Sequence, residues 1–135
     1  MHSYWDDFWA LRGYKDAVQI ATWLGHADEG KRFTASRNEF TNDLRASLAT
    51  ATQSKSLDFI PGSAELGDFD PTSTTIALAP ADAADVLPPG LLMKSFERYW
   101  NESQARANGT RACARSPSAT SCSRAFGFEI GRAHV

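Results

Sequence analysis

The spacing of apolar residues predicts helices and no β-sheet of consequence. Residues 5–24 carry apolar side chains at i, i+3 and i+4 spacing over a wide arc, which is typical of a helix buried on most sides. Gly25 is expected to end this helix, and Asp28 to cap the next one. Residues 28–53 instead have a narrow apolar face, made of Phe33, Phe40, Leu44 and Leu48. A broad-faced helix followed closely by a narrow-faced one predicts an αα-hairpin with an inner and an outer member.

Proline and glycine divide the second half of the chain into shorter pieces. Residues 54–70 are expected to form a loop, because Pro61-Gly62 and Gly67 break regular structure. Asp70 and Pro71 then provide a helix cap followed by proline at the first helical position, so a short helix over 72–79 is expected. A third substantial helix, again narrow-faced, is predicted from Leu91 to about residue 102.

The start of the first helix combines acids with aromatic residues, in the order Trp5-Asp6-Asp7-Phe8-Trp9. Aromatic side chains favour burial, whereas a carboxylate resists it. An acid in a confined, aromatic-walled place is typical of carbohydrate sites, because acetal cleavage needs carboxyl groups. The structural alternative is an Asp helix cap flanked by core aromatics.

The hairpin connectivity predicts where the acids meet. The second helix returns to the start of the first, so the 54–70 loop is expected to emerge beside that start. Five carboxylates would then lie together at this end of the hairpin: Asp6, Asp7, Glu65, Asp68 and Asp70. Acids also favour the positive end of a helix dipole, so this grouping is equally typical of helix N-termini. On that alternative, Asp70 serves as a cap.

Several stretches carry a resemblance to a known family. The segment Ser3–Gly13, with Asp16-Ala17 and Leu24-Gly25 after it, resembles bacterial six-hairpin glycosidase-like proteins, which are (α/α)6 barrels. The similarity continues through residues 61–71 and ends near Glu102. The resemblance implies an all-α fold in which αα-hairpins form part of an (α/α)6 toroid, truncated, with residues 1–103 as a partial catalytic domain. We expect more sequence before Met1 in the natural protein, and no activity from this chain alone.

The resemblance also implies roles for individual residues. In related enzymes, one carboxylic acid protonates the glycosidic oxygen and a second carboxylate, ~6.5–9.5 Å away, activates a water molecule, which inverts the anomeric centre. Asp6 or Asp7 is the expected general acid, because burial beside tryptophan would raise a carboxyl pKa. Asp6 is the first candidate and Asp7 the second. Asp68 is a weaker candidate for the partner. The residues expected to bind the sugar are Trp5, Trp9, Phe69 and Glu65.

A different function class stays open. On this alternative the chain is a non-catalytic helical-hairpin module for binding or structure, with its acids acting as caps and Trp9 as core. Residues 1–102 hold fifteen acidic residues against nine Lys and Arg, a net charge of −6, which disfavours a nucleic-acid partner. No apolar run is long enough to span a membrane. We expect no cofactor and no metal, whereas localisation and oligomeric state stay open.

The composition changes after about residue 103. Residues 103–135 hold five Arg, no Lys and a single acid, Glu129, and they contain both cysteines. The final run Ile130–Val135 matches the translation of a common sequencing adapter. We therefore interpret residues 104–135 as a disordered, out-of-frame or adapter-derived tail and exclude it from fold reasoning. The alternative is an Arg-rich arm for nucleic acid.

Overall fold

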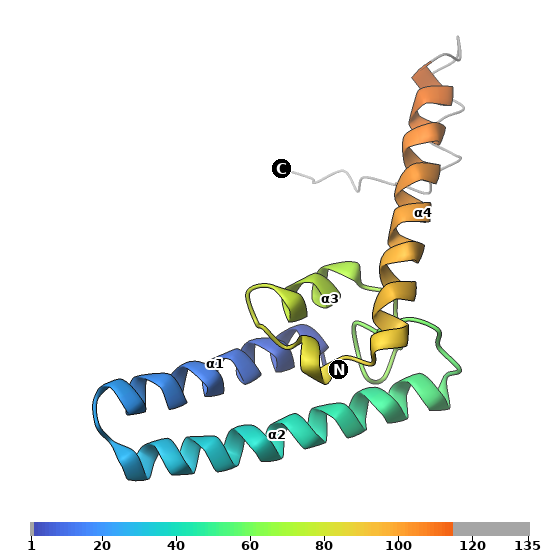
Figure 1. Cartoon of the computed structure of the whole chain (residues 1–135). Coiled ribbons are helices and arrows are strands. Elements are labelled where there is room, and N and C mark those ends of the chain that lie inside the picture. The colour runs from blue at the N-terminus through green and yellow to red at the C-terminus, as the bar shows by residue number, and fades with distance from the viewer. Residues whose placement is uncertain (1, 115–135) are drawn as a thin grey trace, which may run out of the picture. The chain divides into compact units, whose positions relative to one another are not determined.

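The computed structural model describes residues 2–114, and this part of the chain is helical. It contains α1 (Tyr4–Trp23), α2 (Ala27–Ser54), α3 (Pro71–Leu78) and α4 (Pro89–Ala114), with a short 3-10 helix, η1 (Ala84–Val86), before α4 (Figure 1). Within the described residues, β-pairing is limited to two isolated bridges. The predicted all-α class is therefore confirmed for this part of the chain.

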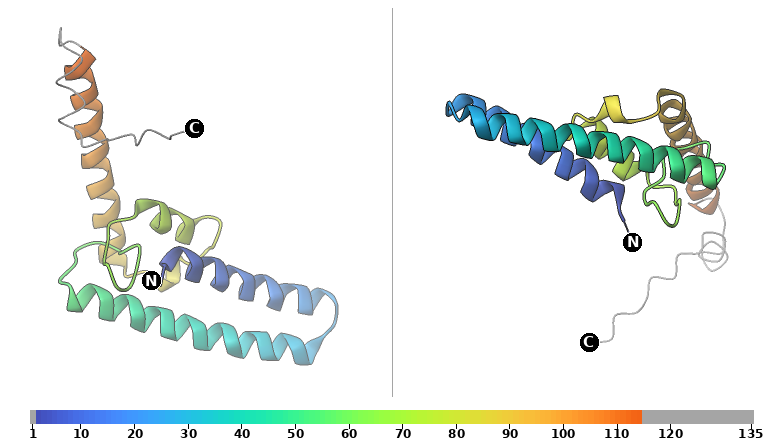
Figure 2. Two further views of the ribbon diagram at one scale, coloured as in Figure 1. Left: turned by 180° about the vertical axis from the view of Figure 1, so that it is seen from behind. Right: turned by 90° about the horizontal axis from the view of Figure 1, so that it is seen from below.

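Helices α1 and α2 form the predicted antiparallel hairpin and pack along one another (Figure 1 and the left view of Figure 2). Tyr4, Phe8 and Leu11 repeat at helical spacing on α1 and are buried against Leu44 and Leu48 of α2. These side chains form the centre of the core. The first half of α1 is therefore the half that packs tightly.

The turn between the two helices follows one predicted signal and departs from another. Gly25 has a φ of +73°, in the left-handed region that glycine adopts without strain, so its predicted place at the end of α1 is confirmed. The expected cap Asp28 is wrong, because α2 begins at Ala27, with His26 at the N-cap position. Asp28 lies in the first turn instead, where the positive end of the helix dipole stabilises its negative charge.

The loop after α2 returns to the start of α1, as the connectivity predicts. The Tyr4 N–H donates to the Gly62 carbonyl at 3.0 Å, and the Ala64 N–H donates to the His2 carbonyl at 3.1 Å. Ser3 and Ser63 form an antiparallel bridge between these segments. The loop therefore satisfies a backbone donor at the head of α1 that the helix itself leaves open.

Helix α3 begins as the sequence predicts and extends the core. The Asp70 carboxylate accepts a hydrogen bond from the Thr72 N–H at 2.9 Å, and Pro71 occupies the first turn. Ala77 of α3 is buried in the core, and buried side chains after the helix continue it: Ala81, Ala83, Val86 and Leu87. Ile60 of the loop is also buried, and its N–H donates to Ser95 Oγ at 2.9 Å.

The second half of α1 is covered by α2 along a narrow strip. Ala21 is buried there and would lie 3.7 Å from a Cβ built on Gly30. Ile20, Trp23 and Leu24 are exposed, Trp23 to 76%. The broad apolar arc of α1 is therefore only partly buried by the described residues.

The chain divides into two compact units, residues 1–98 and 99–135, and α4 contributes to both. Helix α4 continues past the expected boundary at residue 103. Residues 104–107 are Gln, Ala, Arg and Ala, all of which favour helix. The rest of the predicted tail, 115–135, lies outside the described residues. Among residues 2–114, no helix combines the length and apolarity needed to cross a bilayer.

Candidate functional site

The head of α1 is organised by backbone hydrogen bonds and leaves its two acidic side chains free of a capping role. Ser3 is the N-cap residue, and its carbonyl accepts from the N–H groups of Asp6 and Asp7 at 3.1 and 3.4 Å. The structural alternative of an Asp cap is therefore wrong here. Both carboxylates lie in the first turn, where the helix dipole favours negative charge.

The two adjacent acids differ in their surroundings. Asp7 is half-buried, whereas Asp6 is exposed. Burial raises the pKa of the Asp7 carboxyl, nearby His2 lowers it, and the neighbouring Asp6 charge raises it, with a net shift upwards. Asp7 is therefore the better general-acid candidate, because it holds its proton to a higher pH than an ordinary aspartate.

A small cavity of about 140 Å³ lies beside Asp7, between α1 and α2. It is lined by Asp7, Phe40, Asp43, Leu44 and Ser47. Ser47 hydrogen-bonds the Tyr4 hydroxyl at 2.9 Å, and burial raises the pKa of Tyr4 while this bond lowers it. Asp43 and Ser47 were absent from the sequence-based site because only the pairing of α2 with α1 places them beside Asp7.

Glu65 is drawn to the N-terminal segment. Its carboxylate accepts from the His2 N–H at 2.8 Å and lies 2.6 Å from His2 Nδ1. These bonds lower the pKa of Glu65 to about 2. Glu65 thus lies close to the start of α1, as predicted, although its oxygens already have partners within the chain.

Asp68 and Asp70 are brought together around Gly62. Asp68 Oδ1 accepts from Ser63 Oγ at 2.6 Å, and the Asp68 carbonyl accepts from the Gly62 N–H at 2.8 Å. Burial raises the pKa of Asp70, but hydrogen bonds from Ser73 and Thr72 outweigh it and lower the pKa. A Cβ on Gly62 would lie 2.6 Å from Asp70 Cβ, so only glycine fits. Because Gly62 also bonds Tyr4, both acids belong to the loop that pairs with the start of α1.

The aromatic residues predicted to bind sugar differ in how far other side chains already contact their rings. The Phe69 ring meets Phe59 edge-on, with centroids 5.3 Å apart, and the Arg98 guanidinium lies 4.3 Å from the Phe69 centroid. A sugar stacking on Phe69 would therefore compete with the Arg98 cation–π contact. Trp5 is half-buried and Trp9 is 43% exposed, one helical turn apart.

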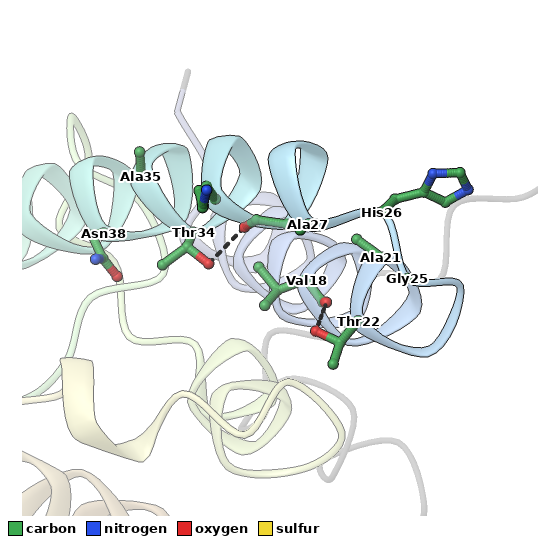
Figure 3. Close-up of a pocket in the computed structure, with 11 residues that line it drawn as sticks. Val18, Ala21, Thr22, Gly25, His26, Ala27, Thr34, Ala35 and Asn38 are labelled. Carbon is green, nitrogen blue, oxygen red and sulfur yellow. Dashed lines mark hydrogen bonds between the residues drawn. The ribbon is translucent and has the colours of Figure 1, made fainter.

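The larger hollow at the other end of the hairpin offers little chemistry. This cavity of about 630 Å³ lies where α1 ends and α2 begins, and small side chains form much of its lining (Figure 3). Its threonine hydroxyls are used within their own helices, with Thr22 donating to the Val18 carbonyl and Thr34 to the Gly30 carbonyl, each at 2.8 Å. The His26 ring points away from the cavity (Figure 3).

No group of three or more metal-ligating side chains occurs within residues 2–114. Comparisons with protein-family models, with curated proteins and with solved structures found no match. The head of α1 is therefore the part of the described chain whose geometry bears on function.

Proposed function

We propose that this chain is part of a glycoside hydrolase-like protein of the six-hairpin, (α/α)6 type, and that the head of α1 forms part of its carbohydrate site. The observation that carries the proposal is Asp7, a half-buried carboxyl whose pKa is raised by burial and by Asp6. A raised carboxyl pKa favours the protonated form that a general acid needs. The resemblance of residues 3–13 to this family supports the same role.

The proposed chemistry assigns separate tasks to the acids. Asp7 donates its proton to the glycosidic oxygen as the bond to the leaving group breaks, a contribution of about 10²–10⁴-fold in rate. The neighbouring Asp6 carboxylate contributes to the raised Asp7 pKa through charge repulsion, after burial. A second carboxylate activates water, and Asp68 is the candidate for it in this chain. Its Ser63 hydrogen bond fixes one oxygen and leaves the other available.

The proposed sugar-binding surface follows α1 from Trp5 to Trp9. These tryptophans lie at i and i+4, on one side of the helix, and Trp9 presents open aromatic surface. Glu65 and Phe69 contribute less, because His2 and Arg98 already contact them.

A tryptophan-resolved binding experiment tests the proposal. The chain has four tryptophans, whose indole N–H signals are assignable by NMR. On titration with a panel of neutral oligosaccharides to about 10 mM, above the usual KM range, the Trp5 and Trp9 signals are expected to shift saturably. Trp23 and Trp100 are internal controls and should not shift. Trp9→Ala should abolish the response, whereas Trp23→Ala should leave it intact.

A second candidate function is a non-catalytic helical-hairpin module. It is favoured by the internal hydrogen bonds of Glu65, Asp68 and Asp70, each of which has a structural partner. If no oligosaccharide in the panel shifts the Trp5 and Trp9 signals, the carbohydrate proposal is wrong. The non-catalytic helical-hairpin module is then the favoured function.

A further inference from the structure

A third cavity, of about 710 Å³, lies between α1, α2 and the segment that contains η1. None of the residues at the head of α1 lines it. Eight of the nine residues that line it are polar or charged, and the ninth is Ala84: Lys15, Arg37, Asn38, Thr41, Asn42, Arg45, Asp82 and Asp85. This cavity therefore offers a recognition site separate from the proposed carbohydrate surface.

Helix α2 supplies one wall of the cavity at regular spacing. Arg37, Thr41 and Arg45 follow one another at i, i+4 and i+8, so they lie along one side of the helix. The Thr41 hydroxyl donates to the Arg37 carbonyl at 2.7 Å, which fixes its rotamer. The two arginines therefore lie at either end of one row of polar groups.

Two of the three cations are held by carboxylates. Arg45 Nη2 donates to Asp85 Oδ2 at 3.1 Å and to the Asp85 carbonyl at 3.2 Å. Lys15 Nζ lies 3.8 Å from Asp82 Oδ2 and 3.9 Å from Asp85 Oδ1, and it donates to the Asp82 carbonyl. These contacts connect α1 and α2 to the 82–85 segment, and they hold Lys15 and Arg45 in place at the cavity.

Arg37 is different, because its charge has no carboxylate counterpart among the described residues. The residue as a whole is half-buried, and its guanidinium donates from Nε and Nη2 to the amide oxygen of Asn38, at 3.3 and 3.1 Å, in exposed hydrogen bonds. Three cations against Asp82 and Asp85 give the cavity a net positive charge. A guanidinium presents five donors in a planar fork that fits a carboxylate or a phosphate.

We propose that this cavity binds a small polar ligand through an oxyanion group, a carboxylate or a phosphate, with Arg37 as its principal contact. Lys15 and Arg45 flank the group as fixed positive charges. The side-chain amides of Asn38 and Asn42 supply hydrogen bonds for the polar remainder of the ligand. The role of the Asp82 and Asp85 contacts is to position the cations before the ligand arrives.

Titration of the whole chain with three probes tests the proposal. Inorganic phosphate carries the phosphate arm, glucuronate the carboxylate arm, and glucose is the neutral control, all at the same ionic strength. Saturable NMR shifts at Arg37 and Thr41 are expected with at least one anion and not with glucose. The anion that binds more tightly identifies the group that the cavity recognises.

Paired charge variants distinguish a built site from general attraction. Arg37→Gln is expected to weaken anion binding about tenfold or more, the scale of one charge-assisted hydrogen bond. Arg32→Gln also removes one positive charge from α2, but Arg32 lies over the Phe33 ring and outside the cavity lining. The anion affinity of this variant should therefore stay within about twofold of that of the parent chain. Arg37→Lys, which keeps the charge but not the fork, should bind with intermediate affinity.

Two outcomes overturn the proposal. Equal weakening in the Arg37→Gln and Arg32→Gln variants would show nonspecific attraction, and an absence of saturable shifts with either anion would leave the cluster as a purely structural ion-pair network. Circular dichroism of each variant at the titration temperature checks that helix content is unchanged. The carbohydrate response of Trp9 is measured separately, so failure of one proposal does not decide the other.

Discussion

Asp7 and Glu65 have carboxyl pKa values shifted in opposite directions, for different physical reasons. Asp7 loses hydration in the half-buried first turn of α1, which disfavours its charged form. Glu65 is exposed, but the N–H and ring of His2 stabilise its charged form. Since a pKa shift is also a statement about stability, the two residues predict opposite pH effects.

Asp7→Asn is expected to stabilise the fold at neutral pH. The folded-state pKa of Asp7 lies above its unfolded value, so the native state binds more protons and the free energy of unfolding falls as pH rises from about 3.8 through the raised pKa. Removing the charge removes this cost, by less than about 1 kcal/mol because solvent screens a half-exposed carboxyl. Urea denaturation at pH 3 and pH 7 measures it. A variant less stable than the parent at pH 7 contradicts the sign.

Removing the His2 ring is expected to raise the pKa of Glu65. The folded pKa of about 2 lies below the ordinary value of 4.5, so this pair stabilises the fold above pH 4.5 and loses that contribution as pH falls towards 2. In His2→Ala the backbone N–H bond remains, so the titration midpoint should move only part of the way to 4.5. Carboxyl NMR shifts against pH give the midpoint. His26→Ala is the control, and an unchanged Glu65 midpoint in His2→Ala would exclude the ring as a cause.

At the scale of elements, Gly62 joins the loop, α1 and α3 in a small volume. Its carbonyl accepts from the Tyr4 N–H at the head of α1, its N–H donates to the Asp68 carbonyl, and it lies close to Asp70 at the cap of α3. The site therefore depends on a close backbone approach as well as on its acids.

Two glycine-to-alanine variants are expected to have opposite effects. In Gly62→Ala the new methyl would lie 2.6 Å from Asp70 Cβ, so the loop must shift, at a cost of about 1–3 kcal/mol. Gly13 lies inside α1 with open space around it, so Gly13→Ala should stabilise the helix by about 0.5–1 kcal/mol. Thermal unfolding of both variants measures the difference. Similar stability changes in the two variants would mean that Gly62 is not closely packed.

The elements that local sequence signals define were predictable. The α1–α2 hairpin follows from apolar spacing, the turn from Gly25, and the start of α3 from Asp70 and Pro71. The site was less predictable, because its contacts join residues far apart in sequence. Neither the His2–Glu65 pair nor the position of Arg98 over Phe69 has a local pattern, and both arise from packing of the loop.

At the scale of the whole molecule, α1 buries its first half and exposes apolar side chains along its second half. Ile20, Trp23 and Leu24 are exposed in the described part of the chain. Contiguous exposed apolar residues favour association.

Polar substitution of this exposed surface is expected to improve solubility without loss of stability. Combined Ile20→Lys, Trp23→Gln and Leu24→Gln should lower the binding of a hydrophobic dye and raise solubility, with little change in the melting temperature, since surface substitutions each change stability by about 0.5 kcal/mol or less. Leu48→Ala, at a buried position, should instead cost about 2–5 kcal/mol. A large loss of stability in the triple variant would indicate that these side chains are buried in solution.

The most direct test of the proposed site is the titration of the Asp7 carboxyl, followed by its carbon-13 chemical shift in the whole chain. The account predicts a pKa above the ordinary value of 3.8, because burial and the adjacent Asp6 both disfavour the charged form. A pKa at or below 3.8 would contradict it and would remove Asp7 as the proposed general acid.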